Sequence, residues 1–127
     1  MLKRGGGDVL RPIPKRILRT TVVAEVATGV DVYQQPTFDS YVIKNVHIQP
    51  TTEIRKTPTN TDQQLRSILF ADCKYSTPFA WDEMLQSAHA IGGDLKVIAN
   101  GIEYTALSVD ALRDDTDRLH HYEVNLY

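Results

Sequence analysis

The sequence contains little cysteine, and it has no long apolar run. Cys73 is the only cysteine among 127 residues, so no disulfide can form within the chain, which fits a reducing cytoplasm. Because Cys73 lies in an apolar, strand-like segment, we expect its thiol to be buried in the core. No apolar run approaches the roughly 20 residues that a membrane-spanning helix needs. The basic N-terminus also lacks the apolar segment of a secretory signal, so we expect no membrane partner.

The sequence also lacks the common catalytic and metal-binding motifs. It has no phosphate-cradling glycine-rich loop, no HExxH motif and no nucleophile elbow. His120 and His121 are neighbours in a strand-like segment, where adjacent side chains point to opposite faces and cannot readily share one metal ion. The acidic cluster at 114–117 lacks the ordered pattern of a calcium loop. We therefore expect a protein that is not an enzyme and that has no metal site and no cofactor.

The formal net charge is only −2, which gives no general case for nucleic-acid binding, but the charges are unevenly distributed. Residues 1–81 carry 11 Lys and Arg against 7 Asp and Glu, whereas residues 82–127 carry 3 against 9. Two interpretations stay open. The charges either cluster by chance on a solvated surface, or they form a basic and an acidic flank through which subunits associate head to tail in a ring.

The clearest structural pattern lies between Gly93 and Asp110. Apolar residues alternate with polar ones on both sides of Asn100-Gly101, a pair that tolerates the positive φ angles of a type I′ turn. This pattern predicts a tight antiparallel hairpin with one buried face. A lone hairpin is marginal in water, so further strands must pack around it.

The remaining segments complete a mainly β fold. Further strands are expected at 20–26, 41–48, 65–75 and 120–127, turns at 29–36 and 113–118, and a short amphipathic helix from Trp81 to Ile91. In the second strand we place Val42, Val46 and Ile48 on one face and allow a bulge, and we expect the last strand to pair with the sheet edge. The sum is a small antiparallel β-barrel or sandwich of five to six strands with one short helix and a long protruding loop. We expect residues 1–10 to form a flexible arm and residues 11–127 a single β-barrel domain.

The segment from Gln49 to Gln64 is rich in Thr, Gln and Asn and almost free of apolar residues. Such a segment cannot offset its ordering entropy by burial, so we expect a loop or a long, exposed hairpin tip. Polar loops of this length in a small domain are usually either disordered or functional, which makes this segment the first candidate site.

Four stretches together resemble a known family. They are RPIPKRIL (11–18), NVHIQPT (45–51), ILFADCKYSTP (68–78) and GDLKVIANGIEYTALSVDAL with LHHYEVNLY (93–127). In their order and spacing they resemble the small minor capsid or head-completion proteins of tailed phages and prophages of Gram-positive bacteria. None of these stretches is a catalytic motif.

The resemblance implies a structural virion protein of the phage neck, assembled in the bacterial host cytoplasm. Such a head–tail connector stopper forms a homo-oligomeric ring below the portal and its adaptor, retains the packaged DNA and gives the tail a docking surface. Its partners would be further copies of itself, the portal adaptor protein, tail terminator or tail proteins, and the DNA in the channel. The channel loop of the related stoppers corresponds here to Thr51, Thr52, Glu53, Arg55, Lys56, Thr57, Asn60, Asp62, Gln63 and Gln64.

The charges suggest two further roles. Arg55 and Lys56 would attract the phosphates at the DNA end. The basic residues Arg11, Lys15, Arg16 and Arg19 would contact the adaptor or a neighbouring subunit.

Two alternatives are kept. One is an adaptor or tail-terminator subunit of the same machine, although tail terminators tend to contain more helix than is predicted here. Alternatively, it is a small nucleic-acid-binding β-barrel, which requires aromatic residues interleaved with basic ones on an exposed strand. Only Lys74-Tyr75 offers that pattern.

Overall fold

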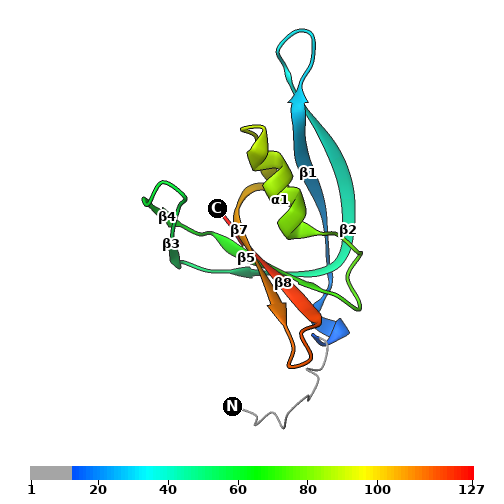
Figure 1. Ribbon diagram of the computed structural model, residues 1–127. Coiled ribbons are helices and arrows are strands. Elements are labelled where there is room, and N and C mark those ends of the chain that lie inside the picture. The colour runs from blue at the N-terminus through cyan, green and yellow to red at the C-terminus, as the bar shows by residue number, and fades with distance from the viewer. Residues whose placement is uncertain (1–12) are drawn as a thin grey trace.

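A computed structural model describes residues 13–127 and has a closed antiparallel β-barrel at its centre (Figure 1). The barrel strands follow the order β1-β2-β5-β8-β7-β6, and β1 closes the ring by pairing with both β2 and β6. The elements of this part of the chain are η1 (Lys15–Ile17), β1 (Thr20–Val30), β2 (Pro36–Pro50), β3 (Ile54–Lys56), β4 (Asp62–Gln64), β5 (Ser67–Asp72), α1 (Trp81–Ala90), β6 (Leu95–Ala99), β7 (Ile102–Arg113) and β8 (Leu119–Leu126). The predicted mainly β fold with one short helix is confirmed. The predicted arm at 1–10 lies outside the described residues.

The predicted hairpin around Asn100-Gly101 is confirmed as β6 and β7. Asn100 and Gly101 have φ values of 52° and 77°, as a type I′ turn requires. The side chains of Leu95, Val97 and Ala99 are at most 2% exposed, so one face of β6 packs entirely into the barrel.

The β1–β2 hairpin is longer than predicted. Strand pairing continues to Gly29↔Thr37 and Val30↔Pro36, and the hairpin extends beyond the barrel as a two-stranded ribbon (Figure 1). The Asp31 side chain closes its loop, because Oδ1 accepts hydrogen bonds from the backbone N–H groups of Tyr33 (2.8 Å) and Gln35 (3.0 Å). The turn therefore occupies only 31–35, and Gly29 and Pro36 belong to the strands.

A bulge interrupts β2 where the register shifts from Val22↔Ile43 to Thr20↔Val46. Between these two pairs the chain advances three residues along β2 but only two along β1. Within the bulge, Asn45 takes a φ of 60°, and its side chain donates a hydrogen bond to the Tyr75 carbonyl (3.1 Å). The bulge puts Ile43 and Val46 on the same, buried face, while Val42 is 57% exposed. The allowance for a bulge is confirmed, and the assignment of Val42 to the same face as Val46 is wrong.

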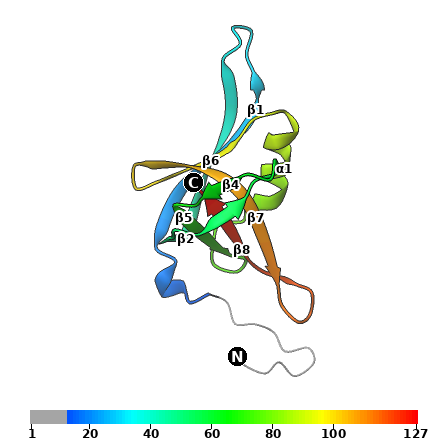
Figure 2. The same ribbon diagram turned by 90° about the vertical axis from the view of Figure 1, so that its left-hand side faces the viewer.

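Helix α1 packs against β1, β6 and β7 (Figure 2). Trp81, Leu85 and Ala88 are buried, and the partly buried Met84 packs against the same core, so the predicted apolar stripe is structural. The helix ends where the Gly93 N–H donates to the Ala88 carbonyl (2.9 Å). A Cβ at Gly93 would collide with the Cβ of Ala27, so only glycine allows this close approach to β1.

Two predictions at the strand ends are wrong. Cys73 is exposed, because β5 ends at Asp72 and the Asp72 Oδ2 atom accepts from the N–H groups of Lys74 and Tyr75, which turns the chain outward. Strand β8 is not an edge strand, since it pairs with β5 on one side and β7 on the other. Closure of the barrel gives the last strand a second partner.

Candidate functional site

The polar segment at 49–64 forms an ordered hairpin on the side of the barrel (Figures 1 and 2). β3 and β4 pair through Ile54↔Gln64, Arg55↔Gln63 and Lys56↔Asp62 as a separate two-stranded sheet. The alternative of a long, exposed hairpin tip is therefore the correct one. We call residues 51–64 the lateral hairpin.

The tip of the lateral hairpin is held by threonine hydroxyls. Thr57 Oγ1 lies 2.7 Å from Thr61 Oγ1 and 3.0 Å from Thr59 Oγ1, and the Thr57 N–H donates to the Thr61 carbonyl (2.8 Å). Asn60 takes a φ of 63°, a left-handed conformation that asparagine tolerates better than most residues. The tip is a small, uncharged cluster of hydroxyl groups that are already oriented.

The charged residues of the lateral hairpin pair with one another. Arg55 Nη2 lies 3.0 Å from Glu53 Oε1, and Lys56 Nζ lies 2.8 Å from Asp62 Oδ1. These pairs bring the hairpin close to neutrality, so Arg55 and Lys56 give its surface less net positive charge than their side chains alone would. Exposed ion pairs contribute about 0–1 kcal/mol to stability. A phosphate group can therefore compete with the carboxylates for the Arg55 or the Lys56 side chain.

The base of the lateral hairpin is anchored to the barrel. The Leu65 N–H donates to the Glu53 carbonyl (2.8 Å), and the Thr51 N–H donates to the Arg66 carbonyl (3.1 Å). Leu65 belongs to a second apolar cluster with Ile68 and Leu107. This anchoring distinguishes the attached base from the exposed tip.

The predicted basic contact residues form a separate surface at one end of the barrel. Lys15 and Arg16 lie in η1 and Arg19 follows it; all three are exposed, and the Arg19 Nε–H donates to the Arg16 carbonyl (2.7 Å). Arg11 lies outside the described residues. The Lys15 and Lys74 ammonium groups lie 6.0 Å and 5.4 Å from the centre of the Tyr75 ring.

The histidine geometry differs from the prediction. The Nδ1 atoms of His120 and His121 lie 2.7 Å apart, and His121 Nε2 lies 2.9 Å from Glu123 Oε2, so the rings do not point to opposite faces. Among residues 13–127, no group of three or more His, Cys, Asp or Glu side chains is arranged to hold a metal ion. Within the same range, no helix has the length and apolar character needed to cross a membrane.

Comparison with protein families identifies the class of the chain. The family model for minor capsid proteins matches residues 14–126. The chain belongs to the minor capsid protein family. Comparisons with curated proteins and with solved structures give no match. This family member is a structural component of a phage virion, and its partners are those of virion assembly.

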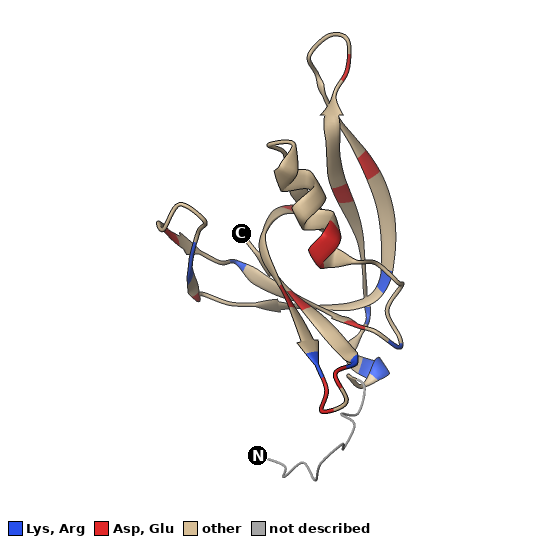
Figure 3. Ribbon diagram, in the orientation of Figure 1, with Lys and Arg blue, Asp and Glu red and all other residues tan. Residues whose placement is uncertain are grey.

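Basic and acidic residues of this family member gather on different parts of the surface (Figure 3). The basic η1 and the acidic 114–118 turn lie at the same end of the barrel, on opposite sides of it in the view of Figure 2. Acidic residues dominate the opposite end, where the β1–β2 ribbon carries Glu25, Asp31 and Asp39. The charge distribution is therefore not a simple division into a basic flank at 1–81 and an acidic flank at 82–127, because the ribbon is an acidic region within residues 1–81.

Sequence reasoning missed the apolar character of the β1–β2 ribbon. Val30, Val32, Tyr33 and Phe38 are between 50% and 87% exposed on a ribbon that extends beyond the barrel (Figure 1). The available signal was the presence of Val30, Val32 and Tyr33 within a segment otherwise typical of a polar turn. Large apolar side chains on a protruding ribbon are typical of a surface that binds another molecule.

Proposed function

We propose that this minor capsid protein is a head–tail connector stopper. Copies of the chain form a ring in the phage neck, below the portal and its adaptor, retain the packaged DNA and provide the surface on which the tail docks. The observation that supports this role most directly is the lateral hairpin. It extends from the barrel at the position where the resemblance to stoppers places a channel loop.

The mechanism that we propose is steric. Hairpins from all subunits of the ring converge on the axis of the channel, and their threonine tips crowd it. The hydroxyl cluster of Thr57, Thr59 and Thr61 supplies donors and acceptors that can bond across subunits as well as within one. The Arg55 and Lys56 side chains exchange their carboxylate partners for phosphate when the DNA end arrives.

A shortened hairpin tests this mechanism. Replacing residues 57–61 by Asn-Gly removes the tip while keeping the Lys56↔Asp62 pair at its base. We expect the protein to fold and to enter particles, and the packaged DNA to be lost from heads. The matched control replaces Thr57, Thr59 and Thr61 by serine, which keeps the hydroxyls and should keep the DNA. Normal genome retention by the shortened variant, with the protein present in particles, would refute the channel role.

The proposal also assigns a role to the exposed basic residues at the end of the barrel. Arg16 and Arg19, with Arg11 and Lys15, contact the adaptor or the neighbouring subunit. The double variant Arg16→Glu, Arg19→Glu should then fail to enter particles, while Arg55→Glu, with its charge change on the lateral hairpin, should enter normally. Normal occupancy of the neck by the double variant would contradict this contact.

Two alternative functions remain. An adaptor or tail-terminator role in the same machine predicts loss of tail attachment without loss of packaged DNA. Direct nucleic-acid binding is favoured by one observation, the two lysines beside the Tyr75 ring. A mobility shift of single-stranded DNA by the purified chain, abolished by Tyr75→Ala, would support that function; absence of any shift would exclude it.

A further inference from the structure

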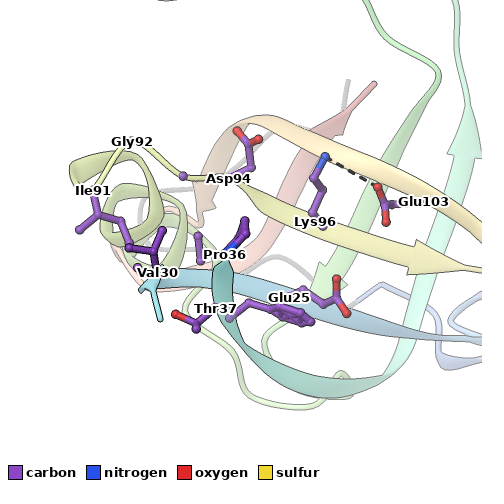
Figure 4. Close-up of a pocket in the computed structure, with 13 residues that line it drawn as sticks. Glu25, Val30, Pro36, Thr37, Ile91, Gly92, Asp94, Lys96 and Glu103 are labelled. Carbon is purple, nitrogen blue, oxygen red and sulfur yellow. Dashed lines mark ion pairs between the residues drawn. The ribbon is translucent and has the colours of Figure 1, made fainter. Parts of the chain in front are cut away.

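A groove of about 580 Å³ lies between the outer half of the β1–β2 ribbon and the segment that follows α1 (Figure 4). The proposed stopper mechanism does not use it. Val30 and Ile91 lie close together at one end, and Lys96 and Glu103 lie at the other (Figure 4). The groove is therefore formed by segments that are distant in the sequence.

The groove combines apolar walls with an acidic rim. Val30, Phe38 and Ile91, which line it, are each at least 50% exposed. The charged residues that line it are three carboxylates, Glu25, Asp94 and Glu103, and one ammonium group, Lys96, whose Nζ lies 3.7 Å from Glu103 Oε2. A ligand that is apolar and basic complements this lining.

The groove also offers a strand edge. β1 pairs with β6 only from Val23 to Val26, after which the Ala27 N–H donates to the Asp94 carbonyl (3.1 Å). Within residues 13–127, the last three residues of β1 pair with no strand on the β6 side. Unpaired edges flanked by apolar side chains accept extended peptide segments as an additional strand.

The chain itself contains a segment with the required chemistry. Residues 1–12, MLKRGGGDVLRP, carry three basic residues against one acidic residue, together with Leu2, Val9 and Leu10. Twelve extended residues reach about 40 Å. The segment thus has the charge, the apolar side chains and the length to occupy the groove.

The position of Ile13 indicates that the occupant comes from another molecule. The Ile13 N–H donates to the buried Asp72 Oδ1 (2.9 Å), which fixes the start of the folded region beside η1. η1 precedes the Thr20 end of β1, whereas the groove is lined by the other half of this strand, from Glu25 to Val30. The 11 residues of β1 span about 35 Å. To reach the Val30 end of the groove, the segment of the same copy would spend almost its whole length of about 40 Å on the distance alone, a limit that does not apply to the segment of a second copy.

We propose that this groove binds the N-terminal segment, residues 2–11, of a second copy of the chain. Each copy supplies one segment and one groove, and in a ring each segment enters the groove of the next copy, so the contact is heterologous and links subunits head to tail. The proposal deepens the ring of the proposed function by naming the two contact surfaces. It concerns self-association alone and does not require the stopper role.

Disulfide trapping in the purified full-length chain tests the proposal. In a Cys73→Ser background, one tagged population carries Leu10→Cys and a second population carries Thr37→Cys at the groove. After mixing at high concentration and mild oxidation, we expect a disulfide between the two populations. A single population that carries both substitutions should give a ladder of linked chains. The matched control pairs Leu10→Cys with Thr59→Cys, which lies on the lateral hairpin, and should give only background linkage.

Charge variants test the complementarity. Glu25→Lys with Asp94→Lys in the groove should lower the linkage yield about fivefold, as expected for the loss of roughly 1 kcal/mol of attraction. Lys3→Glu with Arg4→Glu should have the same effect without any change in the barrel. Glu53→Lys should leave the yield unchanged.

Two results would overturn the proposal. One is a disulfide formed only within single chains of the double variant, and the other is linkage no greater than that of the Thr59→Cys control. Both results are separable from a failure of the stopper role, because genome retention is measured in particles and linkage in the purified protein.

Discussion

Replacing Asp72 should destabilise the fold through the backbone groups that its carboxylate binds. The side chain is only 3% exposed and accepts three backbone hydrogen bonds, from Ile13 (2.9 Å), Lys74 (2.8 Å) and Tyr75 (3.2 Å). Hydrogen bonds to charged groups contribute about 1.5–3 kcal/mol each, but donors in a surface turn regain water when the carboxylate is removed. We therefore expect Asp72→Ala to lower the free energy of unfolding by about 2–4 kcal/mol, and Asp72→Asn, which keeps one acceptor oxygen, by about half of that.

Urea denaturation followed by Trp81 fluorescence measures this loss. Trp81 is the only tryptophan and is fully buried, so its emission reports on loss of the core. With a slope of about 2 kcal/mol per molar urea, the midpoint for Asp72→Ala should fall by about 1–2 M. The matched control is Asp114→Ala, since the Asp114 carboxylate also accepts from two turn amides but on the surface, and its midpoint should move much less. Equal midpoints for Asp72→Ala and the unmodified protein would refute the proposed anchoring.

Two further predictions concern Gly101 and Cys73. Gly101→Ala should lower the free energy of unfolding by about 1–2 kcal/mol, because φ is +77° at this position. The control Ser87→Ala, on the exposed face of α1, should change it very little. Equal urea midpoints for the two variants would contradict the type I′ turn. Cys73 should react with a thiol reagent in the native protein, because it is exposed. Desolvation and the Asp72 carboxylate raise its pKa, so the thiolate fraction at neutral pH is low and the labelling rate should keep rising at pH values where an ordinary thiol has levelled off. Full protection from the reagent would contradict the exposure of Cys73, and a plateau at the same pH as free cysteine would contradict its raised pKa.

Features of the fold that depend on local sequence could be predicted. The Asn100-Gly101 hairpin depends on two adjacent residues and on alternation beside them, and both are visible in the sequence. The helix beginning at Trp81 is equally local, since its apolar residues recur at helical spacing and two glycines end it. The local patterns left a barrel and a sandwich both open, because the pairing of β1 with β6 that closes the barrel joins segments about 70 residues apart.

Other predictions were wrong because a single side chain changes the course of the backbone. Gly29 and Pro36 are common turn residues, but Asp31 closes a tighter loop, so both remain in strands. Asp72 turns the chain after β5 and exposes Cys73, although the apolar run around it suggested burial.

The candidate site was predicted in part. Composition alone indicated that the lateral hairpin is exposed, because it contains almost no apolar residues. The pairing of Lys56 with Asp62 depends on the strand register, which composition does not specify. The groove beside the β1–β2 ribbon was missed for a similar reason, since it combines that ribbon with Ile91 and Asp94 from the segment after the helix.

Removal of the gene from its phage or prophage tests the stopper role most directly. Full heads, empty heads and free tails are counted by electron microscopy after induction. We expect heads that package DNA and then lose it, together with unattached tails, and restoration of both by the unmodified gene supplied separately. Normal infectious particles in the absence of the protein would contradict the stopper role, and heads that stay full but lack tails would restrict the protein to tail attachment.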